Sequence, residues 1–253
     1  MRQRKATSVP RKVRLDAELV ARGFFSNTSD AMRSIMAGDV STSDRRLTSP
    51  GEQVKPGLPL HVRGQVPYVS RGGLKLERGL DALGVDPAGL NCVDVGCSTG
   101  GFTDCLLKRG AKHVLSVDVG RAQFDWSLRQ DSRVTLLERT NIVDVPDMPG
   151  YEGSFQLAVC DVSFTSVVTI LPAVVRLLGL GGTFLTLVKP QFEAPREHVG
   201  EGGIVRDPEV RKAALNKVSA AMEAAGFVLD GSCESPITGH KGNVEFLLAG
   251  HLL

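Results

Sequence analysis

Four charged residues lie beside apolar segments of the sequence, where a polar side chain needs a chemical reason. Lys75 lies near the start of a predicted helix, and Glu245 interrupts the apolar run 244–249. Asp161 and Lys189 each follow an apolar predicted strand directly. Amines and carboxylates gathered around one ligand can align a nucleophile and take up its proton, which is general acid–base chemistry.

Each of the four also has a structural explanation. A single lysine such as Lys75 is by default solvated, and Asp161 can cap the helix that follows it. Lys189 can point outward from a strand end, and Glu245 can occupy the polar face of an edge strand. Taken singly, Lys75 and Glu245 are better explained structurally, whereas Asp161 and Lys189 fit either explanation equally. Taken together, the structural explanation requires four independent coincidences around one site.

A glycine-rich loop follows the first apolar strand of the larger part of the chain. Its spacing, Asp94-x-Gly96-x-x-x-Gly100-Gly101, is not the Gly-x-Gly-x-x-Gly that seats a dinucleotide pyrophosphate. It also lacks the lysine of a phosphate-binding loop. With an acid inside the strand before the glycines, the loop suits S-adenosylmethionine, which carries no phosphate.

Two polar residues after later strands extend this predicted site. Asp118 ends the next strand, where an acid binds a ribose diol, and Asn141 follows the third strand and can bond the adenine edge. Together these features favour a methyltransferase over a dehydrogenase. The candidate cofactor-binding residues are Asp94, Gly96, Ser98, Thr99, Gly100, Gly101, Phe102, Asp118, Asn141 and Asp161.

Alternating apolar strands and helices must position these residues. Strands are predicted at 92–95, 114–117, 134–137, 155–160 and 183–188, with helices at 102–109, 124–130, 167–178 and 207–226 between and after them. This alternation predicts a doubly wound, Rossmann-like α/β sheet covered on both faces. Two final strands follow, 227–233 and 244–248, and the second is predicted as an antiparallel edge. In such a sheet Lys75, Asp161 and Lys189 could converge over the methyl donor, and Glu245 could join them.

The first 80 residues differ in charge from the rest. They hold 15 Lys and Arg against 7 Asp and Glu, whereas residues 81–253 hold 15 against 21. This asymmetry fits either a part that meets a polyanion or a solvated basic face. Two short helices are predicted, one ending at Gly23 and one between a Ser29 cap and Gly38, followed by small strands.

The predicted organisation is a basic arm at 1–13, a small α+β domain at 14–63, a linker at 64–70 and the methyltransferase domain at 71–253. The candidate residues for binding a polyanion such as RNA are Arg4, Lys5, Arg11, Lys12, Arg14, Arg22, Arg33, Arg45, Arg46 and Arg71. Aromatic residues make up only 5% of the chain, so few can stack on bases, and Tyr68 and Phe164 are the candidates for that role. Binding of a nucleic acid would therefore depend mainly on phosphate contacts and on salt.

Composition excludes several classes of protein. No apolar run reaches about 18 residues, so no membrane span is expected, and no apolar segment follows the basic N-terminus as in a secretory signal. The five cysteines form no Cys-x-x-Cys pair, which argues against a disulfide framework or a zinc knuckle. We therefore expect a cytoplasmic protein without a metal site.

The small domain carries the pattern Arg14-Leu15-Asp16…Leu19-Val20-x-Arg22-Gly23…Ala31…Ile35-Met36-Ala37-Gly38. In this pattern it resembles the RNA-binding domain named after ribosomal protein S-four, and a helical cap on the larger domain is the alternative. The strings at 68–77, 94–104, 161–164, 188–193, 203–208 and 242–246 resemble the TlyA/hemolysin A family, which joins that domain to an FtsJ-like methyltransferase. The resemblance implies 2′-O-methylation of cytidine in ribosomal RNA, with S-adenosylmethionine as donor. It also implies a catalytic tetrad, which falls on Lys75, Asp161, Lys189 and Glu245. We expect Lys189 to handle the hydroxyl proton.

Three alternatives to this function stay open on the sequence alone. The chain could be an RNA- or ribosome-binding protein that keeps the nucleotide fold without activity, an NAD-dependent oxidoreductase, or a membrane-active haemolysin. The missing dinucleotide motif disfavours the oxidoreductase, and the lack of a long amphipathic helix disfavours the haemolysin. We expect ribosomal subunits as partners, no membrane contact and a monomer, while the methylated nucleotide and the choice of subunit stay open.

Overall fold

The computed structural model describes residues 12–42, 45–58, 60–63 and 67–253. The chain divides into two compact units, Met1–Pro67 and Tyr68–Leu253. Residues 68–70, predicted as linker, belong to the second unit, because Tyr68 is buried there and the Val69 N–H donates to Asp104 at 2.9 Å. Of the predicted basic arm, residues 1–11 lie outside the described part.

The first unit holds two helices, small strands and its own apolar core. Its elements are β1 (Val13–Arg14), α1 (Leu15–Ala21), α2 (Thr28–Met36), β2 (Val40–Ser41), β3 (Arg46–Leu47), β4 (Gln53–Val54) and β5 (His61–Val62). Val13, which was assigned to the arm, pairs with Val54 in the β1–β4 ladder. Leu15, Leu19 and Ile35 are fully buried and join the helices to the strands.

The cap of α2 differs from the prediction. Asn27, not Ser29, has extended backbone, and its side chain accepts from the Asp30 N–H at 3.0 Å. Asn27, Thr28 and Ser29 are all residue types that cap helices, so the sequence alone does not choose among them.

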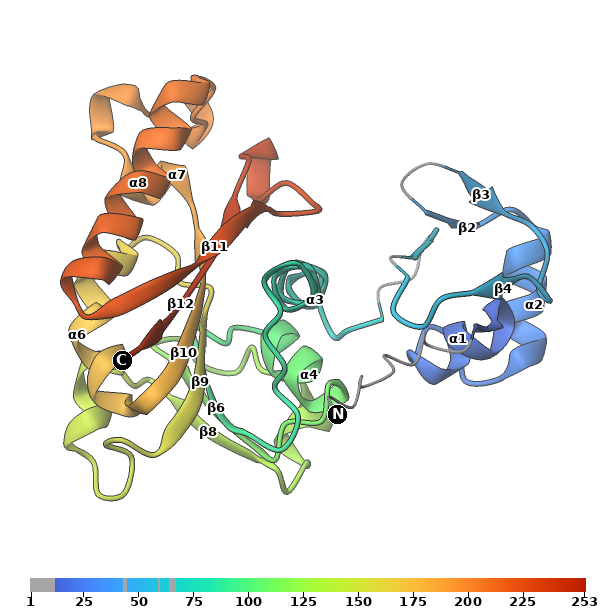
Figure 1. Cartoon of the computed structure of the whole chain (residues 1–253), viewed down its shortest axis with the longest axis horizontal. Helices are drawn as coiled ribbons and strands as arrows, with labels where there is room; N and C mark the ends of the chain where they lie inside the picture. The colour runs from blue at the N-terminus through green and yellow to red at the C-terminus, as the bar shows by residue number, and fades with distance from the viewer. Residues whose placement is uncertain (1–11, 43–44, 59, 64–66) are drawn as a thin grey trace, which may run out of the picture. The chain divides into compact units, whose positions relative to one another are not determined.

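The second unit is built on one seven-stranded sheet (Figure 1). In spatial order its strands are β11 (Phe227–Glu234), β12 (Phe246–Leu252), β10 (Leu178–Val188), β9 (Phe155–Cys160), β6 (Asn91–Val95), β7 (His113–Asp118) and β8 (Val134–Glu138). The five strands from β10 to β8 are parallel, and β12 runs antiparallel to both of its neighbours. The predicted doubly wound α/β class is confirmed.

Strand order reverses between β6 and β9, because the chain fills one side of β6 with β7 and β8 before it returns to the other side with β9. Ligands of such sheets bind outside the carboxyl ends of the strands at this switch point. The prediction that the last strand is an edge is wrong: β12 lies inside the sheet and is mostly buried, and β11, with alternating exposure, is the edge.

Helices cover both faces of the sheet, as Figure 1 shows for the second unit. One face carries α3 (Gly72–Leu83), α4 (Gly101–Lys108) and α5 (Trp126–Arg129). The other carries α6 (Val167–Leu177), α8 (Pro208–Ala224) and the 3₁₀ helix η1 (Ile142–Asp147). Each face has its own apolar core, so the strands between them are apolar on both sides. None of the helices in the described part of the chain is both long and apolar enough to cross a membrane.

Candidate active site

Sheet register brings three of the four charged candidates to one place. The last paired residues of β10 and β12 are Val188 and Phe246, so Lys189 and Glu245 are the next residues on two adjacent strands. Asp161 leaves β9 beside them, and its N–H donates to the Val95 carbonyl of β6 at 3.0 Å. The carboxyl ends of three parallel strands and the start of β12 therefore meet here.

Asp161 and Lys189 form a close ion pair. Their Oδ1 and Nζ atoms are 2.6 Å apart, and the same Nζ donates to the Ser163 hydroxyl at 2.8 Å. Lys189 is only 8% exposed, and its Nζ lies 5.9 Å from the centroid of the Phe192 ring. The amine is therefore held in one position, and it does not extend into solvent from the strand end.

Lys75 and Glu245 form a second pair, which joins α3 to the residue before β12. Lys75, in the first turn of α3, donates to Glu245 Oε2 at 2.5 Å, and Glu245 is 2% exposed. A Cβ on Gly239 would overlap Glu245 Oε1, so this backbone approach requires glycine. The two structural alternatives are wrong here, because Lys75 is nearly buried and Glu245 precedes β12 instead of facing solvent from it.

Two residues that the sequence analysis did not single out hold these pairs in place. Buried Asn243 accepts from the Val205 N–H at 3.0 Å and donates to the Gly203 carbonyl at 2.8 Å, which joins two loops beside Glu245. Glu193 of α7 (Pro190–Glu193) accepts from the Ser166 hydroxyl at 2.6 Å and from the Val167 N–H at the start of α6 at 2.7 Å, which fixes the loop after Asp161. Both lie in motifs seen in the sequence, but nothing there distinguished them from their neighbours.

A cavity of about 390 Å³ opens beside the Asp161–Lys189 pair. Its walls come from the ends of β6 and β7, the segment after β8 and the loop after β9, and they include Gly96, Ser98, Asp118, Asn141 and Asp161. Gly96 has φ +81°, and a Cβ there would lie 3.1 Å from the Asp161 carbonyl oxygen, so only glycine leaves the backbone this close. The glycine loop therefore forms a wall of the cavity.

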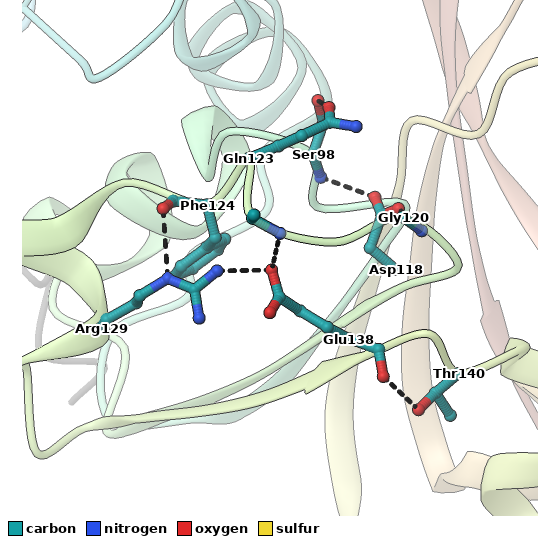
Figure 2. Close-up of polar contacts among 9 residues, drawn as sticks. Ser98, Asp118, Gly120, Gln123, Phe124, Arg129, Glu138 and Thr140 are labelled. Carbon is teal, nitrogen blue, oxygen red and sulfur yellow. Dashed lines mark hydrogen bonds and ion pairs between the residues drawn. The ribbon is translucent and has the colours of Figure 1, made fainter.

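Asp118 is held at the cavity wall by backbone donors. Its Oδ2 accepts from the Ser98 N–H at 2.8 Å and its Oδ1 from the Gly120 N–H at 2.6 Å (Figure 2). Each oxygen keeps a further lone pair for a ligand hydroxyl. Asn141 also lines the cavity and uses its side-chain oxygen to cap η1 through the Val143 N–H at 3.3 Å. An acid and an amide at these strand ends fit the ribose and the adenine of S-adenosylmethionine.

The other half of the predicted cofactor set does not line the cavity. Gly100 has φ +95° and caps α4, Gly101 begins that helix against Ser70, and Phe102 is buried in the core. Thr99 accepts the Asp125 N–H through its carbonyl. These residues support the glycine loop from the side away from the cavity.

Asp94 also lies behind the loop. It is fully buried, and its Oδ2 accepts from the Thr103 hydroxyl at 2.6 Å. Burial, with smaller contributions from the nearby Asp161 and Asp118 charges, raises the pKa of Asp94 to about 7. Among the described residues its Oδ1 has no hydrogen-bond partner.

Of the two aromatic residues considered for stacking, only Phe164 is accessible. Tyr68 is buried in the core between α3, α4 and the sheet. Phe164 is 91% exposed and lines the cavity mouth. Its backbone has φ +65°, a conformation that residues other than glycine rarely adopt. Its ring centroid lies 5.2 Å from that of Phe192, beside Lys189.

The predicted RNA-binding residues fall into three groups. Arg4, Lys5 and Arg11 lie outside the described residues. Arg14, Arg33 and Arg45 form ion pairs with Asp16, Asp30 and Glu52, and Arg22 donates to the Leu58 carbonyl at 2.6 Å. Lys12, Arg46 and Arg71 are exposed, and within the described part of the chain they make no ion pair. Arg71 belongs to the second unit, at the start of α3.

Known proteins resemble the chain over nearly its whole length. The model of the FtsJ-like methyltransferase family matches residues 68–252. A Bacillus subtilis protein, YqxC, provisionally named as an rRNA methyltransferase, is 48% identical over 95% of the chain and 86% of its own length. The 16S/23S rRNA (cytidine-2′-O)-methyltransferase TlyA of Mycobacterium tuberculosis is 42% identical over 94% of this chain and 89% of its own length. A solved Streptococcus thermophilus structure, provisionally titled a hemolysin, matches with a TM-score of 0.71 and 41% identity, over 97% of this chain and 90% of that one.

Proposed function

The chain belongs to the TlyA/hemolysin A family of FtsJ-like methyltransferases, and on this premise we propose that it methylates the 2′-hydroxyl of cytidine in ribosomal RNA. S-adenosylmethionine is the proposed donor, and ribosomal subunits in the cytoplasm are the proposed substrate. The oxidoreductase alternative is wrong, because the family model that matches the nucleotide fold is that of a methyltransferase.

One observation carries the proposal. Asp161 lines the cofactor cavity and is also ion-paired to Lys189 at 2.6 Å. A single carboxylate therefore joins the donor site to a nearly buried amine. Methyl transfer to a hydroxyl needs this arrangement, because the oxygen must lie in line with the methyl group and close to a proton acceptor.

Each residue of the tetrad has a distinct role in this proposal. Bound S-adenosylmethionine supplies an electrophilic methyl group on a sulfonium. Lys189, in its amine form, accepts the proton of the attacking 2′-hydroxyl, and Asp161 holds Nζ at the edge of the cavity. Lys75, in the first turn of α3, and Glu245, just before β12, orient the ribose through their charged hydrogen-bonding groups.

The first unit and Phe164 are the proposed RNA contacts. Lys12 and Arg46 are exposed cations of the small unit, and phosphate contacts from such residues give binding that weakens steeply with salt. Phe164 offers an exposed ring beside Lys189, on which a base turned out of its stack can lie. The S-four-type assignment of the small unit is part of this proposal.

The test is transfer of a radiolabelled methyl group to isolated small and large ribosomal subunits from a strain that lacks the gene. Protein-free RNA serves as a parallel substrate, and Lys189→Ala protein serves as the inactive control. We expect label in subunit RNA that maps to a ribose and is absent with the variant. Tight cofactor binding without label on any RNA would contradict the substrate and favour the inactive binding protein.

A further inference from the structure

The segment 120–125, between β7 and α5, crosses the rim of the cofactor cavity. It is fixed at both ends and in the middle by hydrogen bonds to its neighbours. The Gly120 carbonyl accepts from the Arg139 N–H at 3.0 Å, and the Asp125 N–H donates to the Thr99 carbonyl at 3.1 Å. Between them, the Ala122 N–H donates to Glu138 Oε1 at 2.7 Å.

Glu138 keeps this segment in a strained conformation. Ala122 has φ +57°, in the left-handed region that residues other than glycine rarely occupy. Arg129 pairs with the same Glu138 oxygen and also donates to the Phe124 carbonyl at 3.3 Å (Figure 2). Backbone strain that several contacts maintain is concentrated at ligand sites. Here the next residue is Gln123, which lines the cavity.

The Gln123 amide lies beside the Asp118 carboxylate. A Cβ built on Gly120 would be 2.9 Å from Asp118 Oδ1 and 3.2 Å from Gln123 Nε2, so both groups flank one backbone position. The other amide atom, Oε1, accepts from the Ser98 hydroxyl at 3.4 Å. Ser98 also donates its N–H to Asp118, which places all three residues around the same edge of the cavity.

These two groups have complementary hydrogen-bonding character. A carboxylate only accepts, an amide NH₂ donates, and a hydroxyl does both. A ribose hydroxyl that donates to Asp118 can therefore accept from Gln123 Nε2. We propose that Gln123 is a positioning residue for the ribose of the bound cofactor and pairs with one hydroxyl of its diol. This inference rests on the proposed function, because it takes the cofactor to be S-adenosylmethionine.

The test measures the affinity of S-adenosylhomocysteine and of its 2′-deoxy and 3′-deoxy analogues by calorimetry. Gln123→Met keeps the length of the side chain and removes the amide. Gln130→Met is the matched control, since Gln130 is exposed and is not among the residues that line the cavity. Thermal unfolding without ligand checks that all three proteins are equally folded.

We expect Gln123→Met to weaken S-adenosylhomocysteine about fivefold, as the loss of one neutral hydrogen bond predicts. One deoxy analogue should bind wild type and variant equally, because it lacks the hydroxyl that Gln123 contacts. An unchanged affinity for S-adenosylhomocysteine, or an equal loss for all three ligands, would overturn the inference. Failure of the wild-type protein to bind S-adenosylhomocysteine would instead overturn the proposed function.

Discussion

The proposed cofactor cavity and the proposed catalytic corner, by which we mean Lys75, Asp161, Lys189 and Glu245, share one edge of the sheet but are held in different ways. The cavity is built from residues 95–170, and its polar wall is fixed largely by backbone groups, as at Asp118. The corner is held by side-chain ion pairs, one of which joins residues 170 positions apart. The contacts of the cavity are therefore local in sequence, whereas those of the corner join distant parts of the chain.

We expect this difference to separate cofactor binding from methyl transfer. Changes in the cavity wall should alter cofactor affinity and leave the rate at saturating cofactor nearly unchanged. Changes in the corner should lower that rate and leave affinity nearly unchanged. Asp161 belongs to both regions, so variants of the other residues test the separation more cleanly.

The largest expected effect is a lower rate of methyl transfer in the Lys189→Met variant. Removing the amine removes the proposed proton acceptor, and such a group typically contributes about 10²- to 10⁴-fold to the rate. Single-turnover methylation of ribosomal subunits measures this rate, while calorimetry with S-adenosylhomocysteine should show affinity within about twofold of wild type. Lys212→Met is the control, because Lys212 is an exposed lysine of α8. An undiminished rate would refute the role of Lys189.

Gly239→Ala should lower the rate by between about 10- and 100-fold. The added methyl group would overlap the Glu245 carboxylate and displace it from Lys75, and small misplacements of catalytic groups have costs of this size. Cofactor affinity should stay near that of wild type, since Gly239 does not line the cavity. A normal rate in a variant shown by circular dichroism to be folded would mean that the Lys75–Glu245 pair is dispensable.

Asp118→Asn reverses the pattern, with an expected loss of about 10- to 30-fold in affinity for S-adenosylhomocysteine. The neutral amide forfeits a charge-assisted bond worth about 2 kcal/mol and turns an N–H group toward a backbone donor. At saturating cofactor the rate should approach that of wild type. Asp86→Asn, at an exposed turn, is the control. If the rate falls and affinity does not, the division between the two regions is wrong.

The smallest effect concerns the buried Asp94, behind the cavity. Because its pKa is raised to about 7, the folded state holds a proton that the unfolded state has lost above its ordinary pKa near 4. Its contribution to stability is therefore complete at low pH and decreases as pH rises toward 7. From pH 6 to 7, the free energy of unfolding of wild type should fall by about 1 kcal/mol more than that of Asp94→Asn. Urea denaturation at both pH values measures this, and equal slopes would contradict it.

Sequence patterns predicted the fold better than they predicted the contacts. Near-continuous apolar runs identified the strands correctly, and an acid after such a run marked Asp161. The position of β12 inside the sheet was missed, because alternation in one strand says nothing about its neighbours.

The pairing of Lys75 with Glu245 depends on that same topology. A spacing of 170 residues gives no local signal. In the glycine loop, the pattern identified the turn but did not separate Gly96, which lines the cavity, from Phe102, which packs in the core.

The order of the strands in the sheet also bears on how the protein is made. A nascent chain leaves the ribosome N-terminus first, and its domains begin to fold as they emerge. All residues of the cofactor cavity precede residue 171, but Glu245 arrives only with β12, which must enter between β10 and β11. A nascent chain can therefore assemble the proposed donor site well before it can assemble the proposed catalytic corner. With the proposed roles of these residues, catalytic competence is among the last properties that this sheet acquires during synthesis.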